Sequence, residues 1–328
     1  MIAHCASEPP GNILLVSGSY GTIAPRRRDA PRRDRMSARH WLIFITLTLI
    51  WGSSFLWIKL AVREVGPFMV VSLRVVFALL AILPFLVRQR IRPPRDARRW
   101  GILLAQGLMS ATVPWLFITW AEQHIDSALA TVLNGTVPLF TIVAANAFLS
   151  DERMTASRVT GLLVGFAGVV VLVQDDLRTA LRGAGAPMVL LGQGAMLVSS
   201  FLYGVSNIFA RLKLRGTPPA YQAFYSLLAA SFFVWGATPL VEAPLRLPAS
   251  ALTWVAVAWL GMLGAGVSYL LFYVLLHAVG ATRTATVTYT IPLVGVTLGV
   301  VVLGEPLHWS LVAGMVLIVS GVWRVNRR

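Results

Sequence analysis

The sequence predicts an all-α membrane protein that crosses the bilayer many times. Its 328 residues are 57% hydrophobic and only 12% charged, with a mean hydropathy of +0.73, whereas a soluble domain is roughly 25% charged. Ten apolar runs each approach the length of about 20 residues that a spanning helix needs. Few of these runs alternate polar and apolar residues, which disfavours a β-barrel.

The ten runs, taken in order, give the expected helices. They cover residues 41–62, 68–87, 100–121, 127–149 and 155–173, and then 188–210, 220–240, 251–276, 284–303 and 307–323. Residues 1–40 form a basic tail that we expect to be disordered, and Met36 is a candidate for the native start. The expected organisation is therefore a first repeat at 41–173, a periplasmic linker at 174–187 and a second repeat at 188–325.

The division into repeats rests on a pattern that occurs twice, about 152 residues apart. Trp51-Gly52 opens the stretch WGSSFLWIKLAVREVGP, and Tyr203-Gly204 opens YGVSNIFARLKLRGTPP. In both copies 15 residues separate the glycine from a proline. Two weakly similar halves in a membrane chain are typical of secondary transporters.

A second matched pair lies further along each half. The segment PLFTIVAANAFLSD begins at Pro138, and PLVGVTLGVVVLGE begins at Pro292, an offset of 154. Both prolines are expected to interrupt their helices and to free backbone carbonyl groups. Because each half has an odd number of crossings, the second half must enter the membrane inverted relative to the first.

The basic residues predict the orientation. With the N-terminus in the cytoplasm, 22 of the 28 Lys and Arg fall on the cytoplasmic side and four on the other, while Lys59 and Arg74 lie within the runs. This asymmetry is the positive-inside pattern, and it places both termini in the cytoplasm. Attraction to anionic lipid then explains the net charge of +15. A nucleic-acid partner is not expected, since no binding motif accompanies the basic tail.

Three segments carry a resemblance to a known family. WGSSFLWIKLAVREVGPFMVVSLRVVFALLAILPF resembles the opening of an EamA repeat of the drug/metabolite transporter (DMT) superfamily. TVPLFTIVAANAFLSDERMTASRVTGLLVGFAGVVVLV and TIPLVGVTLGVVVLGEPLHWSLVAGMVLIVSGVWRV resemble the closing half of that repeat. The resemblance covers about residues 41 to 325.

The resemblance implies two inverted five-helix repeats and alternating access. It also implies export of small organic metabolites, with amino acids and related compounds foremost, across the bacterial cytoplasmic membrane. The substrate pocket would be built from the first, third, fourth, sixth, eighth and ninth runs. Two alternatives stay open: a lipid flippase of the same fold, and a polytopic membrane enzyme, which would need a cluster of acids or histidines at one membrane face.

Arg74 is the sharpest single candidate for the substrate pathway. It lies seven residues past Pro67, about 10 Å along a helix. An intramembrane Arg costs roughly 2.5–3.5 kcal/mol on insertion scales, so it usually faces protein or a watery cavity. It is expected either to meet a carboxylate or phosphate of the substrate, or to snorkel outward or bind backbone carbonyls of a neighbouring helix. Its repeat counterpart is Ser226. Lys59, near the predicted outer surface, is expected to snorkel.

The other pathway candidates are deep aromatic residues, one amide and the two matched prolines. They are Trp51, Trp115, Asn134, Pro138, Tyr203, Tyr269, Tyr289 and Pro292. Core packing is the alternative for each aromatic residue. The acids Asp151, Glu152 and Glu305 each precede an expected helix, where a carboxylate favours the positive end of the helix dipole. A structural role is therefore expected for them.

Several kinds of chemistry are not indicated. None of the thirteen acids lies in the middle of a run; Glu122, at the end of the third, is the most embedded. Proton coupling through a midplane carboxylate is therefore not expected. The chain has no Walker A pattern and no histidine pair at metal-ligand spacing, and Cys5 is its one cysteine. The sequence thus predicts no enzyme activity and no cofactor or metal. The expected partners are a small-molecule substrate and membrane lipid.

Overall fold

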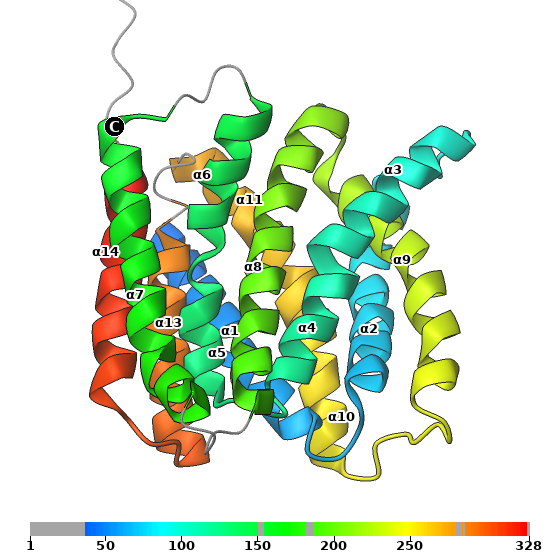
Figure 1. Ribbon diagram of the computed structural model, residues 1–328. Coiled ribbons are helices and arrows are strands. Elements are labelled where there is room, and N and C mark those ends of the chain that lie inside the picture. Colours follow the sequence, from blue (N-terminus) through cyan, green and yellow to red (C-terminus); the bar gives the residue numbers. More distant parts are fainter. Residues whose placement is uncertain (1–36, 150–153, 182–186, 280–283, 285, 327–328) are drawn as a thin grey trace, which may run out of the picture. The chain divides into compact units, whose positions relative to one another are not determined.

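The computed structural model describes residues 37–149, 154–181, 187–279, 284 and 286–326, and within this part of the chain every regular element is helical (Figure 1). The first repeat contains α1 (Ala38–Ala61), α2 (Pro67–Arg88), α3 (Ala97–Gly107), η1 (Leu108–Thr112), α4 (Val113–Ala121), α5 (Ser127–Asn134), α6 (Val137–Phe148) and α7 (Ala156–Leu181). The second contains α8 (Pro187–Lys213), α9 (Pro219–Val241), α10 (Ala251–Ala258), η2 (Trp259–Val267), α11 (Ser268–Val279), α13 (Val287–Leu303) and α14 (Trp309–Asn326).

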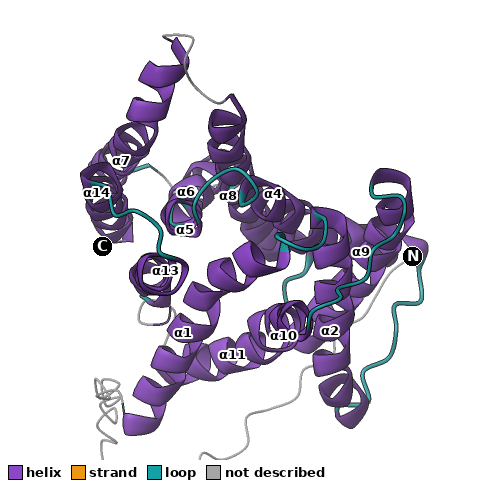
Figure 2. Ribbon diagram, turned by 90° about the horizontal axis from the view of Figure 1, so that it is seen from below, coloured by secondary structure: helices purple, strands orange, loops and turns teal. Residues whose placement is uncertain are grey.

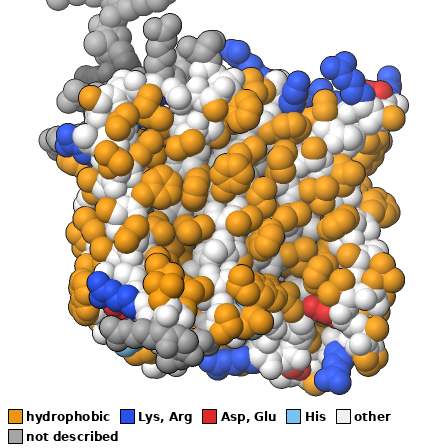
Figure 3. All heavy atoms as spheres, viewed as in Figure 1, with side chains coloured by type: hydrophobic (Ala, Val, Ile, Leu, Met, Phe, Trp, Pro, Cys, Tyr) orange, Lys and Arg blue, Asp and Glu red, His pale blue; other side chains and the backbone are white. Residues whose placement is uncertain are grey.

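The helices suit a bilayer in length and surface. Among the described residues, eight helices are long and apolar enough to cross a membrane, and α13 and α14 are shorter apolar helices. Apolar side chains cover the middle of the face seen in Figure 3, and basic and acidic side chains lie toward its two ends. The protein is thus a multi-pass membrane protein. That the chain crosses the membrane ten times stays a prediction.

Helix α7, which corresponds to the fifth apolar run, is longer than predicted. The apolar run ends at Val173, but α7 continues to Leu181 through a polar segment with Asp175 and Asp176. Charged residues end an apolar run, yet they do not end a helix whose backbone hydrogen bonds continue into water. The expected linker at 174–187 is therefore largely helical in its first part.

The two ends of the helical unit are named here by residues in their connecting segments. The "Glu64 end" carries the α1–α2 connection with Glu64, together with the α4–α5 and α9–α10 connections. The "Arg90 end" carries the α2–α3 connection with Arg90 and the α8–α9 connection, which Arg99 joins through a 2.8 Å hydrogen bond to Thr217. The charge pattern predicts that the Arg90 end is cytoplasmic.

The duplicated aromatic–glycine pairs mark two equivalent helix crossings. A Cβ atom at Gly52 of α1 would lie 2.5 Å from the Cβ of Val294 in α13. A Cβ atom at Gly204 of α8 would lie 2.8 Å from the backbone nitrogen of Thr141 in α6. Each glycine therefore allows its helix to pack closely against the proline-bearing helix of the other repeat. Helices α7 and α14 form a further cross-repeat pair and lie side by side in Figures 1 and 2.

The third and fourth spans of each repeat depart from regular α-helix at matched places. Both third spans contain a π-helical segment, η1 in one repeat and η2 in the other. The fourth span of the first repeat is broken, because α5 ends at Asn134 and α6 begins at Val137 with Pro138 in its first turn. In the second repeat Pro292 lies inside α13 and does not interrupt it. The expected break at Pro292 is wrong, since a helix can retain a proline at the cost of one hydrogen bond.

Candidate functional site

A cavity runs between the two repeats. It consists of two adjoining parts of about 460 and 300 Å³ that share several lining residues, Trp51, Trp115, Tyr203 and Tyr269 among them. The larger part reaches the α8–α9 connection through Asn207 and Arg211, whose side chains are exposed. The cavity is therefore open toward the Arg90 end.

Arg74 places a buried positive charge at the inner part of this cavity. Its side chain, on α2, is 7% exposed. The guanidinium carbon lies 3.9 Å from the centroid of the Trp115 ring, a cation–π contact that stabilises the charge without neutralising it. Its Nε has no hydrogen-bond partner, and no ion pair joins Arg74 to an acid within the residues that the structure describes. A buried cation without an anion leaves room for an anionic ligand.

Aromatic residues form much of the wall around Arg74. Trp51 donates from Nε1 to the carbonyl oxygen of Gly264 at 3.3 Å, and its ring centroid lies 5.8 Å from that of Phe272. Tyr203 and Tyr269 line the same space. This hydrogen bond holds Trp51 between the two repeats, so its apolar ring faces the cavity in a fixed position.

An amide side chain and the segments before the two matched prolines form another part of the lining. Asn134 lines the cavity, and its Oδ1 has no donor among the described residues. Pro138 has no N–H group to bond the carbonyl oxygen of Asn134, four residues earlier, and Pro292 likewise cannot bond that of Thr288. Asn134 and Thr288 both line the cavity, and both stand four residues before the matched prolines. The duplication therefore places equivalent backbone segments on the cavity wall.

The structure thus brings six of the sequence-predicted candidates to one cavity: Arg74, Trp51, Trp115, Asn134, Tyr203 and Tyr269. Tyr289 lies elsewhere; its hydroxyl donates to the carbonyl oxygen of Val322 in α14 at 3.4 Å, and it does not line the cavity. Pro138 and Pro292 do not line it either. Asp151 and Glu152 lie outside the described residues.

Sequence reasoning missed several lining residues. Ser226, the repeat counterpart of Arg74, lines the larger part of the cavity together with Gln106. Thr288 and Phe272 were also missed. The repeat offset was a usable signal, because it pairs Ser226 with Arg74 and Thr288 with Asn134. No comparable signal distinguished Gln106 or Phe272 from neighbouring residues on the same helices.

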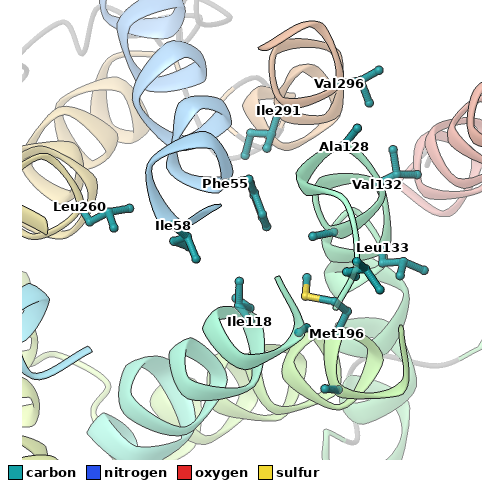
Figure 4. Close-up of a cluster of buried hydrophobic side chains, with 14 of the residues drawn as sticks. Phe55, Ile58, Ile118, Ala128, Val132, Leu133, Met196, Leu260, Ile291 and Val296 are labelled. Carbon is teal, nitrogen blue, oxygen red and sulfur yellow. The ribbon is translucent and has the colours of Figure 1, made fainter. Parts of the chain in front are cut away.

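Apolar side chains close the cavity toward the Glu64 end. Figure 4 shows Phe55, Ile58 and Ile118 facing Leu133 and Met196, with α1, α4, α5 and α8 contributing to the cluster. Ile58 and Ile118 also line the cavity, so this cluster is its floor. Beyond it lies Lys59, whose Nζ donates at 2.7 Å to the carbonyl oxygens of Glu122 and Ile125. That Lys59 snorkels stays a prediction; in the structure its ammonium group binds two carbonyl oxygens just beyond α4.

Three acids join the repeats at the same end, and each binds backbone N–H groups at a helix N-terminus of the other repeat. Glu64 accepts from the backbone nitrogen of Ser250 at 2.9 Å, before α10. Glu242 accepts from the nitrogens of Phe68 and Met69 at 2.8 and 3.0 Å, in α2. We call Glu64, Glu242 and Glu305 the carboxylate caps.

Glu305 is the most buried of the carboxylate caps. It accepts from the backbone nitrogens of Ser127 and Ala128 at 2.8 and 2.9 Å and from the Ser127 hydroxyl at 3.0 Å. The helix that Glu305 caps is therefore α5 of the other repeat, and the expected role at the start of the next helix is replaced by a contact between repeats. Carboxylates at such positions satisfy orphan N–H groups and the positive end of the helix.

Comparison with known proteins gives a consistent result. The model of the EamA-like transporter family matches residues 39–174 and 190–327. A solved crystal structure superposes with a TM-score of 0.62 at 22% identity, over 89% of this chain and 98% of that chain. That likeness concerns the fold.

Curated relatives cover nearly the whole chain. An uncharacterized transporter of Archaeoglobus fulgidus is 26% identical over 88% of this chain and 99% of its own length. A probable amino-acid metabolite efflux pump of Escherichia coli is 24% identical over 88% of this chain and 95% of its own. A probable terminal-alkyne amino-acid exporter of Streptantibioticus cattleyicolor is 25% identical, over 90% and 95%.

Proposed function

This chain belongs to the EamA-like transporter family, and we propose that it is a secondary exporter of small organic metabolites that carry a carboxylate, amino acids foremost. The family and the relatives are named as transporters, not enzymes, and a transporter of this kind takes a small-molecule substrate. The direction, the substrate class and alternating access are the proposal.

The observation that carries the proposal is the unpaired Arg74. A guanidinium group offers a planar fork of donors that matches a carboxylate. In the described structure this fork faces a cavity with Trp115 against one side and no acid bonded to it. A bound carboxylate would supply the missing negative charge in a place where water screens little.

The rest of the cavity suits the remaining parts of an amino acid. The Oδ1 of Asn134 and the carbonyl oxygens of Asn134 and Thr288 are acceptors for an ammonium group. Trp51 and Phe272 offer apolar surface to a side chain. The cavity volume fits a small solute rather than a lipid with its acyl chains, which favours a metabolite over the alternative of a lipid flippase.

The direction of transport follows from the predicted orientation. If the Arg90 end is cytoplasmic, the cavity opens to the cytoplasm and is ready to load a substrate for export. Two of the relatives carry the names efflux pump and exporter, which agrees with this direction. The carboxylate caps and the apolar floor then separate the cavity from the outer side of a bacterial cytoplasmic membrane.

Transport of labelled amino acids by proteoliposomes tests the proposal. Arg74→Ala is expected to lower the transport rate about tenfold to a hundredfold, since a hydrogen-bonded charge contributes about 1.5–3 kcal/mol. Arg74→Lys keeps the charge and is expected to lose less. Arg88→Ala is the matched control, because Arg88 is an exposed arginine at the end of the same helix and does not line the cavity. Unchanged transport by Arg74→Ala at equal protein incorporation would remove Arg74 from the site. Lipid scrambling without movement of any metabolite would favour a flippase.

A further inference from the structure

Glu122 is a buried acid whose carboxyl group has no hydrogen-bond partner in the described part of the chain. It follows α4 directly and is 0% exposed. Neither of its carboxyl oxygens has a hydrogen-bond donor among the described residues. The sequence marks Glu122 as the most embedded acid, and the structure shows that its side chain is fully enclosed.

Charged groups surround Glu122 without bonding its carboxyl group. The nearest cation, Lys59 of α1, donates its two described hydrogen bonds to backbone carbonyls, one of them that of Glu122 itself. Arg74 of α2 and Glu305 before α14 are close enough to act on the charge of Glu122. His124 and Asp126 follow it in the α4–α5 connection.

These surroundings favour the neutral carboxyl group. Burial raises the pKa of the Glu122 carboxyl group well above its usual range; the charge of Lys59 and that of Arg74 oppose this rise, and the charge of Glu305 adds to it. Within the described part of the chain no group donates a hydrogen bond to the two oxygens. The water that an ionised carboxylate would lose is therefore not replaced there. A carboxyl group that is fully buried under these conditions is more stable with its proton.

We propose that Glu122 is a proton-binding site of the transport cycle, which gains a proton when the Glu64 end closes and releases it when that end opens. The inference rests on the proposed function in one respect, because alternating access requires the Glu64 end to open. It leaves in place the expectation that no midplane carboxylate couples protons, because Glu122 lies at the end of the third span.

The position of Glu122 links its protonation to the closing of the Glu64 end. Ile118, one helical turn earlier on the same helix, belongs to the cavity floor. Opening of the Glu64 end separates α1 from the α4–α5 connection, breaks the two bonds of Lys59 and admits water to Glu122. The ionised carboxylate then has water and the freed Lys59 ammonium as partners. Protons therefore favour the closed Glu64 end, and the expected linkage is one proton per opening.

Cysteine labelling tests the linkage without any substrate, so its outcome is independent of the Arg74 experiment. In a Cys5→Ser background, Ala61→Cys reports opening of the Glu64 end, because Ala61 is 0% exposed there. Val241→Cys serves as the reference, because Val241 is exposed. The labelling rate of Ala61→Cys is divided by that of Val241→Cys, and this ratio removes the pH dependence of thiol reactivity. The ratio is expected to fall as the pH is lowered from 8 to 6, by up to about tenfold per pH unit.

Two variants decide whether Glu122 is the cause. Glu122→Gln, which removes the charge at constant shape, is expected to abolish the pH dependence, while Asp175→Asn, at an exposed acid of the same end, retains it. A ratio independent of pH with Glu122 present, or a dependence that survives Glu122→Gln, would overturn the proposal. If the variant does not fold, dicyclohexylcarbodiimide, which reacts with protonated buried carboxyl groups, replaces it. Mass spectrometry should then find the adduct on Glu122, with a yield that falls as pH rises, and no adduct overturns the proposal.

Discussion

The two ends of the transport cavity are built by equivalent parts of the repeats, yet their chemistry differs. At the Glu64 end, acids of one repeat cap helices of the other. At the Arg90 end, the repeat offset makes Gly216 the sequence counterpart of Glu64, and Arg90 the counterpart of Glu242. Both of these residues adopt a positive φ, 75° and 51°, so they serve tight turns instead of cross-repeat caps. Divergence at these paired positions thus leaves acid caps at one end of the cavity and tight turns at the other.

The largest expected effect comes from removal of the most buried cap. Glu305→Ala leaves the Ser127 and Ala128 donors without an acceptor in a buried place. We expect the free energy of unfolding in detergent to fall by about 3 kcal/mol. Glu305→Gln keeps one acceptor oxygen and should lose about half as much. Equal stability of wild type and Glu305→Ala in a denaturant titration would show that the caps do not hold the repeats together.

A smaller effect is expected from crowding the same cap. A Cβ atom at Gly299 would lie 2.3 Å from Oε2 of Glu305, whereas the repeat counterpart of Gly299 is Ala145. Gly299→Ala should displace the carboxylate and cost about 2 kcal/mol. Gly236→Ala is the matched control, because a Cβ atom there meets nothing within 4 Å. Equal melting temperatures of the two variants would show that the Glu305 cap does not need the space beside Gly299. The Glu64 end would then not depend on this cap for its stability.

The smallest effect concerns the pH dependence of stability at Glu64, a half-buried cap. The hydroxyl of Ser250, with further bonds from Thr253 and the backbone, lowers the pKa of Glu64 from 4.5 to about 2. A folded-state pKa below the unfolded value stabilises the fold above pH 4.5, and this contribution disappears as pH falls toward 2. Wild type should therefore be slightly more stable than Glu64→Gln at pH 6, and the two should converge near pH 2. A difference that persists at pH 2 would assign the effect to packing.

Much of the fold could be predicted from the sequence because apolar length and repeat spacing are one-dimensional signals. Arg74 could be identified in the same way, since a charge within an apolar run must face protein or a cavity. The direction in which each side chain points could not be predicted from the sequence. Thr288 lines the cavity while Tyr289 bonds α14, and one residue turns a helix by about 100°. Nothing in the sequence fixes that rotation without the neighbouring helices.

Glu122 illustrates the same limit at a helix end. The sequence places it at a boundary, where an acid usually meets water. In the structure, the Lys59 ammonium group binds the backbone just beyond α4, and the carboxyl group of Glu122 is fully buried. Glu305 was predicted as a helix-start acid, but its partner is a helix nearly two hundred residues earlier in the chain. Contacts between the repeats determine both outcomes, and repeat spacing alone does not reveal which surfaces meet.

Access to the cavity from each side of the membrane is the most direct test of the difference between the two ends. In a Cys5→Ser background, Asn207→Cys carries a thiol on the cavity wall. A membrane-impermeant maleimide is added to right-side-out and to inside-out vesicles of the expressing cells. The account predicts fast labelling in inside-out vesicles, where the Arg90 end faces the reagent, and slow labelling in right-side-out vesicles. Fast labelling from the Glu64 side with protection from the Arg90 side would contradict it.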